Sequence, residues 1–167
     1  EAAMLSDVKW YLYTSTVGVY EPAEILHEDD VWKTQPSKND WYGGWAKRMG
    51  ELQCQAYEKQ FGEGRCSIVR PANVYGPYDN FKIKDAHLIP ALMHRFHLHS
   101  QVGKKLVSYG TGKPKRQFLY SLDFAKIILL ILGNKDIKSG NIICSTDEEY
   151  QIIDVVDKLA DVMKLNK

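Results

Sequence analysis

The sequence SIVRPANVYGP, residues 67–77, joins a β-branched apolar run to an Arg-Pro step and a Tyr-Gly-Pro turn. The apolar run predicts a buried strand. Because Pro71 has no N–H to donate to a central ladder, we expect the strand to end there. Ligands bind at the carboxyl ends of strands in open α/β sheets, and Asn73 offers both a donor and an acceptor at that place. A strand followed by a plain Gly-Pro turn would give the same pattern.

The residues before this stretch predict a strand, a loop and a helix. Residues 8–14 are aromatic and β-branched, which favours a strand that ends in hydroxyl side chains. Residues 27–40 are polar and predict a loop, and residues 45–61 predict a helix. The positions expected to form the buried stripe of this helix are Trp45, Met49, Leu52, Ala56 and Tyr57. The order strand, loop, helix, strand indicates a right-handed parallel crossover.

The second half of the chain also alternates between helices and strands. The expected elements are a helix at 87–96, strands at 106–109 and 117–120, an apolar helix at 122–132, a strand at 141–144 and a helix at 151–165. We expect the apolar helix to be buried on most sides. The alternation predicts an α/β fold. No GxGxxG or GxxGxxG pattern follows a predicted strand, although dinucleotide-binding sheets normally carry one.

Composition narrows the class of partner. The 22 Lys and Arg residues nearly balance the 21 Asp and Glu residues, which gives no reason to expect nucleic acid or a membrane as a partner. No apolar run is long enough to span a bilayer. The three cysteines form no CxxC pair, and His94, His97 and His99 have no further ligand beside them. We therefore expect no metal site, no disulfide framework and a cytoplasmic protein.

Four motifs occur in an order that resembles the extended short-chain dehydrogenase/reductase family, which contains nucleotide-sugar epimerases and dehydratases. They lie at residues 15–20, at 44–51 around Lys47, at 70–77, and at 116–120 with Asp123. Within that family, residues 75–81 and 87–92 are most similar to the GDP-L-fucose synthases. The resemblance covers roughly residues 8–132.

The resemblance implies a Rossmann-like NAD(P)-binding domain, with a doubly wound parallel sheet, and a small α/β substrate domain. Residues 1–77 would form the second half of the NAD(P)-binding domain. Residues 78–167 would hold interleaved segments of the substrate domain and the last Rossmann elements. The family's glycine-rich turn would precede residue 8, so we expect the chain to be an internal piece of a longer enzyme and to be inactive alone. The full-length protein is expected to be a homodimer that uses NAD or NADP.

The family transfers a hydride to or from a nucleotide-diphospho-sugar with acid/base help, and the resemblance places these roles on named residues. Thr16, or less favourably Ser15, would orient the substrate oxygen. Lys47 would favour a phenolate and bond the nicotinamide ribose, and His87 would exchange protons near neutral pH. The residues expected beside the cofactor are Thr14, Ser15, Lys47, Pro71 and Val74.

The substrate's diphosphate has two expected partners. Asn73 and Arg116 match the family residues on that side of the nucleotide-sugar, and a planar guanidinium suits a phosphate. Arg70 is also expected near the nucleotide-sugar or in the wall at the strand end.

Two positions depart from the family pattern. The family's acid/base Tyr stands four residues before the Lys, where this chain has Gly43, and Tyr42 is one residue out of step. Either Tyr42 acts because the helix begins irregularly around Gly43, or the protein uses another group or binds a nucleotide-sugar without turnover. The Cys that GDP-L-fucose synthases use for epimerisation is replaced by Gly18, which transfers no proton. An interaction domain with an α/β fold is a third reading.

Overall fold

The computed structural model describes residues 2–6, 8–62, 64–102, 110–134, 137 and 140–165. The chain divides into two compact units. Unit 1 comprises Glu1–Ala72 and Asp123–Ser145, and unit 2 comprises Asn73–Leu122 and Thr146–Lys167. The division into these units falls after Ala72, and the domain boundary expected after Pro77 stays a prediction. The strand expected at 106–109 lies outside the described residues.

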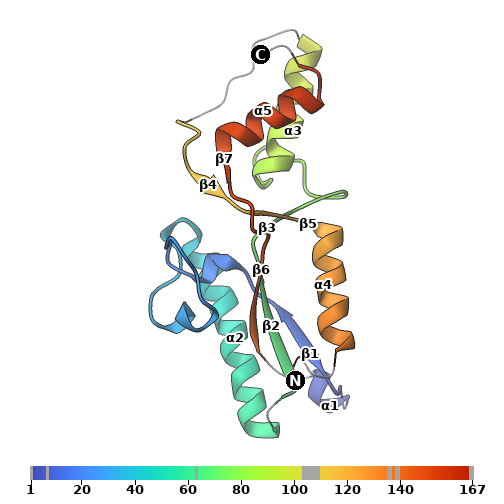
Figure 1. Ribbon diagram of the computed structural model, residues 1–167. Helices are drawn as coiled ribbons and strands as arrows, with labels where there is room; N and C mark the ends of the chain where they lie inside the picture. The colour runs from blue at the N-terminus through green and yellow to red at the C-terminus, as the bar shows by residue number, and fades with distance from the viewer. Residues whose placement is uncertain are drawn as a thin grey trace. The chain divides into compact units, whose positions relative to one another are not determined.

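Unit 1 is built on a parallel sheet of β1 (Tyr11–Thr14), β2 (Cys66–Pro71) and β6 (Asn141–Cys144), in the order β1-β2-β6. Figure 1 shows α2 and α4 flanking these strands. All six residues of β2 are buried, as expected of the central strand of a covered parallel sheet. The strand ends at Pro71, which confirms that prediction. The parallel pairing confirms the α/β class, and β1 begins at Tyr11, later than expected.

Helix α2 (Trp41–Phe61) begins four residues before the predicted start and ends at Gly62, whose φ of 108° suits glycine. The expected buried stripe is wrong, because Trp45, Met49 and Leu52 are 41%, 58% and 43% exposed. The buried side of α2 consists of Gly44, Arg48, Glu51 and Cys54. This polar face can be buried because its charged side chains are hydrogen-bonded inside unit 1, Arg48 to the Val19 carbonyl and Glu51 to Arg70.

The segment between β1 and α2 is not a plain loop. It holds three short 3₁₀-helices, η1 (Val17–Val19), η2 (Glu28–Trp32) and η3 (Lys38–Asp40). Val19, Tyr20 and Val31 form a buried cluster against Ile143 of β6. Through this cluster, the connection between β1 and α2 packs against the sheet.

Unit 2 contains two small ladders and two packed helices. Strand β3 (Asn73–Tyr75) pairs in parallel with β5 (Phe118–Tyr120), and β4 (Lys115–Arg116) pairs antiparallel with β7 (Tyr150–Gln151). Helices α3 (Leu88–Val102) and α5 (Ile152–Val162) lie side by side in Figure 1. Their shared core is Leu92, Phe96, Val155 and Ala160. The core places the first turn of α3 beside the ladders.

Two short elements remain in the fold, α1 (Ala2–Leu5) and α4 (Ser121–Gly133). The expectation that α4 is buried on most sides is wrong for the described chain. Ile131 is its one buried residue there, and Leu129 and Leu130 are 69% and 67% exposed. Apolar side chains favour burial of a helix, but the composition of the helix does not show which segment covers it. Within the described ranges, no helix combines the length and apolar character needed to cross a membrane.

Candidate functional site

The first group of predicted residues lies on the strand-end segment, residues 14–20, which follows β1 in unit 1. Helix α2 holds both ends of this segment. Lys47 Nζ donates to the Thr14 carbonyl at 2.9 Å. One residue further along, Arg48 Nε and Nη2 donate to the Val19 carbonyl at 2.9 and 2.6 Å. The long cationic side chains therefore fix the position of the strand-end segment against the helix.

A buried ion pair lies directly behind the segment. The carboxylate of Glu51 accepts from Arg70 Nε at 3.0 Å and from Arg70 Nη2 at 2.9 Å, and both side chains are fully buried. Glu51 also accepts from Ser15 Oγ at 2.5 Å. Of the two places expected for Arg70, the interior at the end of β2 fits this geometry, because its guanidinium bonds Glu51, Tyr20 and the Glu28 carbonyl. Ser15 keeps only acceptor capacity for another partner.

Tyr20 closes this network. Its phenol oxygen accepts from Arg70 Nη1 at 2.6 Å. Burial raises the pKa of the Tyr20 phenol, although the adjacent Arg70 acts in the opposite direction. The side chain is 3% exposed, so Tyr20 is a structural member of the network.

Thr16 caps η1, with its Oγ1 accepting from the Gly18 N–H at 3.1 Å. Its hydroxyl hydrogen has no partner among the residues that the structure describes, so it can still donate to a ligand. Lys47 likewise keeps two of its three N–H groups, because its one hydrogen bond in the described chain goes to Thr14. These donors lie at the carboxyl end of β1, where the fold class places ligands.

Tyr42 does not share this arrangement. It is the second residue of a continuous α2, and its side chain is 87% exposed. The irregular helix start on which its predicted role rested is therefore absent from the described α2. Gly43 stands one helical turn before Lys47, on the same face.

The side chain of Asp40 lies against Gly18 and Gly43, the two positions that depart from the family pattern. Asp40 was not among the residues predicted from the sequence. A Cβ on Gly43 would collide with Asp40 Oδ1, and one on Gly18 would lie 2.6 Å from Asp40 Oδ2. Asp40 directly precedes α2 but makes no capping hydrogen bond with its side chain. The carboxylate thus fills the space beside two glycines.

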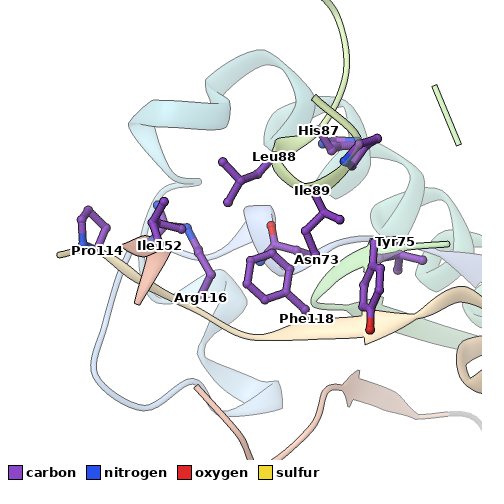
Figure 2. A pocket seen from close by; sticks show the side chains of 11 residues that line it. Asn73, Tyr75, His87, Leu88, Ile89, Pro114, Arg116, Phe118 and Ile152 are labelled. Atoms are coloured by element: carbon purple, nitrogen blue, oxygen red, sulfur yellow. The ribbon is translucent and has the colours of Figure 1, made fainter. Parts of the chain in front are cut away.

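The second group of predicted residues surrounds a cavity of about 310 Å³ in unit 2. Four predicted residues line it together, namely Asn73, Val74, His87 and Arg116. Figure 2 shows His87 and Ile89, at the start of α3, facing Asn73 and Phe118 of the β3–β5 ladder. The remaining lining residues are Tyr75, Leu88, Pro90, Pro114 and Ile152. The cavity is therefore mostly apolar with a few polar groups, the usual composition of a small-molecule site.

The polar side chains of this cavity keep donors for a ligand. Asn73 Nδ2 donates to the Gln117 carbonyl at 2.9 Å, which leaves its second N–H and its oxygen. Arg116 Nη1 donates to the Lys115 carbonyl at 2.7 Å, and the other guanidinium N–H groups have no partner within the described ranges. The His87 ring makes no hydrogen bond there either. These groups suit a ligand that carries an anionic group next to an apolar part.

The residues present fit one end of a nicotinamide cofactor. Thr14, Ser15 and Pro71 stand at the carboxyl ends of the parallel strands β1 and β2, and Lys47 offers free N–H groups there. No glycine-rich strand-to-helix turn for a pyrophosphate occurs in the described part of the chain. The fit therefore covers the nicotinamide ribose end.

A model of the NAD-dependent epimerase/dehydratase family matches residues 1–144. This chain belongs to that family. As a family member, it is 39% identical over 127 residues to the GDP-L-fucose synthase of Dictyostelium discoideum, covering 76% of the chain and 37% of that protein. Over 137 residues it is also 39% identical to the GDP-L-fucose synthase of Sinorhizobium fredii, covering 79% of the chain and 43% of that protein.

The fold agrees with solved structures of family members. A GDP-L-fucose synthetase from Naegleria fowleri superposes with a TM-score of 0.83 at 25% identity, covering 99% of this chain and 53% of that one. The same synthetase has been solved bound to NADP, with the chain covering 54% of it. The match supports a Rossmann-like fold. The chain spans about half or less of the length of these relatives.

Sequence reasoning missed two side chains beside these groups, Glu51 and Asp40, and it did not identify the partner of Arg70. Glu51 stands four residues after Lys47, so helical spacing alone could have placed it on the same face. Arg70 sits in an otherwise apolar run, which in a buried strand demands a carboxylate partner. Asp40 carries no such signal, since an acidic residue before a helix is commonly a cap.

Proposed function

We propose that the full-length protein is an NAD(P)-dependent epimerase or reductase of a GDP-linked sugar. The observation that carries the proposal is the unit 2 cavity, which joins Asn73, His87 and Arg116 around one apolar space. Support also comes from the relatives, which are GDP-L-fucose synthases by name, and from the NADP-bound Naegleria structure. The homodimer and the cytoplasmic location stay predictions, checked by light scattering and by cell fractionation.

The nicotinamide, when bound, would supply the hydride acceptor or donor. Lys47 would bond its ribose with the N–H groups that Thr14 leaves free. Thr14, Ser15 and Pro71, at the carboxyl ends of β1 and β2, would lie beside it. Thr16 would donate its hydroxyl hydrogen to the reacting sugar oxygen, because η1 fixes that hydroxyl at the end of β1.

In the cavity, Arg116 would hold the diphosphate with a planar fork of donors, and Asn73 would add a neutral amide donor. His87 would exchange a proton with the sugar, since imidazole is the side chain that most often acts as a general acid or base. The apolar walls from Phe118, Leu88 and Ile152 would exclude water from these contacts.

The test is Arg116→Gln in the full-length protein, assayed with GDP-L-fucose and NADP. Loss of a charged hydrogen bond of about 1.5–3 kcal/mol should raise KM for the sugar nucleotide about 10- to 100-fold. Lys115→Gln is the matched control, because its exposed side chain pairs with Glu149 at 3.5 Å. A wild-type protein that shows neither turnover nor binding of sugar nucleotides would refute the proposal.

A second candidate is a relative that binds a nucleotide-sugar without turnover through the family's Tyr. Glycine at positions 18 and 43 and the exposed Tyr42 favour it. Tyr42→Phe in the full-length protein should then leave turnover and sugar-nucleotide affinity unchanged. A large loss of kcat on that substitution would remove this candidate and place the phenol in the reaction.

A further inference from the structure

The Asp40 carboxylate lies between two segments of unit 1, helix α2 and the strand-end segment. It stands beside Gly43, one turn before Lys47 on the same face of α2. It also stands beside Gly18, where an added Cβ would be 2.6 Å from Asp40 Oδ2 and 3.5 Å from Thr16 Cγ2. The carboxylate and Thr16 therefore border the same small space, and the Lys47 face of α2 is its other side.

This carboxylate has no structural task in the described chain. Its side chain makes no capping bond to α2, and no ion pair or side-chain hydrogen bond holds it among the described residues. The neighbouring acids contrast with it, since Glu51 is tied to Arg70 and Asp30 to Lys33. An exposed, unpaired carboxylate that borders the same space as Thr16 is in a position to accept a proton from a ligand.

The tyrosines near this space are poorer candidates. Tyr20 is buried, bonded to Arg70, and has a raised pKa. Tyr42 is 87% exposed and one residue out of step with Lys47. Asp40 is the titratable group whose oxygens lie against both glycines.

We propose that Asp40 is the catalytic group that exchanges a proton with the reacting sugar hydroxyl, an assignment that rests on the proposed function. In the oxidising direction, the sugar O–H bond breaks and its proton passes to an Asp40 oxygen. The hydride on the same carbon passes to the nicotinamide cofactor, which leaves a ketone, a reduced cofactor and a protonated Asp40. In the reducing direction, the same proton returns to the carbonyl oxygen as the hydride adds to the carbon.

The first test is Asp40→Asn in the full-length protein with GDP-L-fucose and NADP. The side chain keeps its size but no longer takes a proton, so kcat should fall at least about 100-fold. KM and the apoprotein's melting temperature should be nearly unchanged, because Asp40 makes no structural bond. Asp29→Asn removes the same charge from an exposed site in η2 and should keep wild-type kcat. Equal kcat in the two variants would overturn the proposal.

A second variant moves the carboxylate without removing it. Gly43→Ala places a methyl group against Asp40 Oδ1, so the carboxylate must turn away. Alanine also favours a helix by up to about 1 kcal/mol over glycine, so stability should hold or rise. We expect kcat to fall about 10-fold or more while the melting temperature does not drop. Unchanged kcat in Gly43→Ala would contradict the placement of Asp40.

A binding measurement without cofactor separates this proposal from the proposed function. In protein with carboxyl-labelled aspartate, the resonance absent from Asp40→Asn should shift on adding GDP-L-fucose but not on adding GDP. If GDP-L-fucose binds and this resonance does not move, Asp40 does not touch the sugar and its assignment falls, while the proposed function stands. If wild-type protein neither binds nor turns over GDP-L-fucose, both fall.

Discussion

The Glu51–Arg70 pair shows how one buried carboxylate can fix several neighbours. Glu51 binds a guanidinium and a hydroxyl at once, and Arg70 goes on to bond Tyr20 and the Glu28 carbonyl. Removing one partner would leave the other charge buried and unpaired. The pair therefore matters less for the attraction it supplies than for the penalty its loss would cause.

We predict that Glu51→Gln lowers the free energy of unfolding of the full-length protein by about 3–5 kcal/mol, measured by urea denaturation. Exposed Glu24→Gln is the matched control and should stay within about 0.5 kcal/mol of wild type. Replacing both partners, Glu51→Leu with Arg70→Met, should recover most of the loss, since no charge then remains buried. A mild loss in the single variant would show that Arg70 finds another anion.

At this scale, sequence reasoning found residues that line one cavity better than it found the supporting ones. Asn73, His87 and Arg116 belong to local motifs, and the structure brings them to one cavity. Their roles there stay predictions. Glu51 and Arg70 depend on a contact between a helix and a strand, which spacing within either segment does not encode.

Helix α2 is the element that organises unit 1. Arg48 donates to the carbonyls of Val19 and Thr34, and its guanidinium lies 5.5 Å from the Trp32 ring and 5.4 Å from the Trp45 ring. A buried cation that satisfies two carbonyls ties the long connection after β1 to the helix. This function explains why a charged residue is buried in the helix.

We predict that Arg48→Met destabilises the full-length protein by about 1–3 kcal/mol for each carbonyl left without its donor. Arg65→Met removes the same charge from an exposed position and should change stability by less than about 0.5 kcal/mol. Thermal unfolding followed by circular dichroism measures both. If the two variants unfold together, the Arg48 hydrogen bonds contribute little.

A cysteine in the C-terminal half of α2 gives a pH dependence. Burial, and next the neighbouring Cys66, raises the pKa of the Cys54 thiol from 9.0 to about 12. The unfolded chain loses this proton at lower pH than the folded chain does. The resulting stability is complete below about pH 9 and is lost as the pH rises towards 12.

We therefore predict that the free energy of unfolding falls between about pH 9 and pH 11, and that Cys54→Ala makes this fall shallower. Urea denaturation of the reduced full-length protein at several pH values gives the two slopes. The comparison uses slopes because the loss of the side chain also shifts the absolute stability. Parallel slopes would mean that Cys54 ionises equally easily in both states.

Helical periodicity predicted that α2 exists and where it ends, but it chose the wrong inward face. The rule assumes that apolar side chains lie inward, and here Arg48 and Glu51 are buried because their partners lie inside unit 1. The error follows from treating polarity as exposure. Arg48 and Glu51 stand at i and i+3 on α2, and the apolar strand β2 carries Arg70. A charged residue in a buried strand needs a charged partner, and this pattern would have indicated the correct inward face.

For the whole molecule, the order of strands and helices was enough to predict a parallel α/β sheet. The order of these elements does not by itself place the division into two units after Ala72, because the chain leaves and re-enters each unit. The short β3 and β5 pair across a long separation, so no local pattern reveals their ladder. The prediction that α4 is buried failed for a similar reason. Whether another segment covers a helix depends on the tertiary structure, not on the sequence of the helix.

We predict that residues 1–167 expressed alone bind NADP no tighter than the millimolar range. The described residues offer donors for the nicotinamide end but no glycine-rich turn for the pyrophosphate, which normally contributes much of the affinity. Titration calorimetry with the full-length protein as the positive control measures the difference. Micromolar binding by the 167-residue chain would refute this prediction.

The attachment of the strand-end segment to α2 also constrains how this chain can change in length. Lys47, Arg48 and Glu51 reach their partners because each leaves the helix in a fixed direction, and one inserted residue would rotate those beyond it by ~100°. Insertions and deletions within this part of α2 would therefore break several contacts together. Residues 21–26, exposed and without regular structure for most of their length, should absorb length variation among homologues instead.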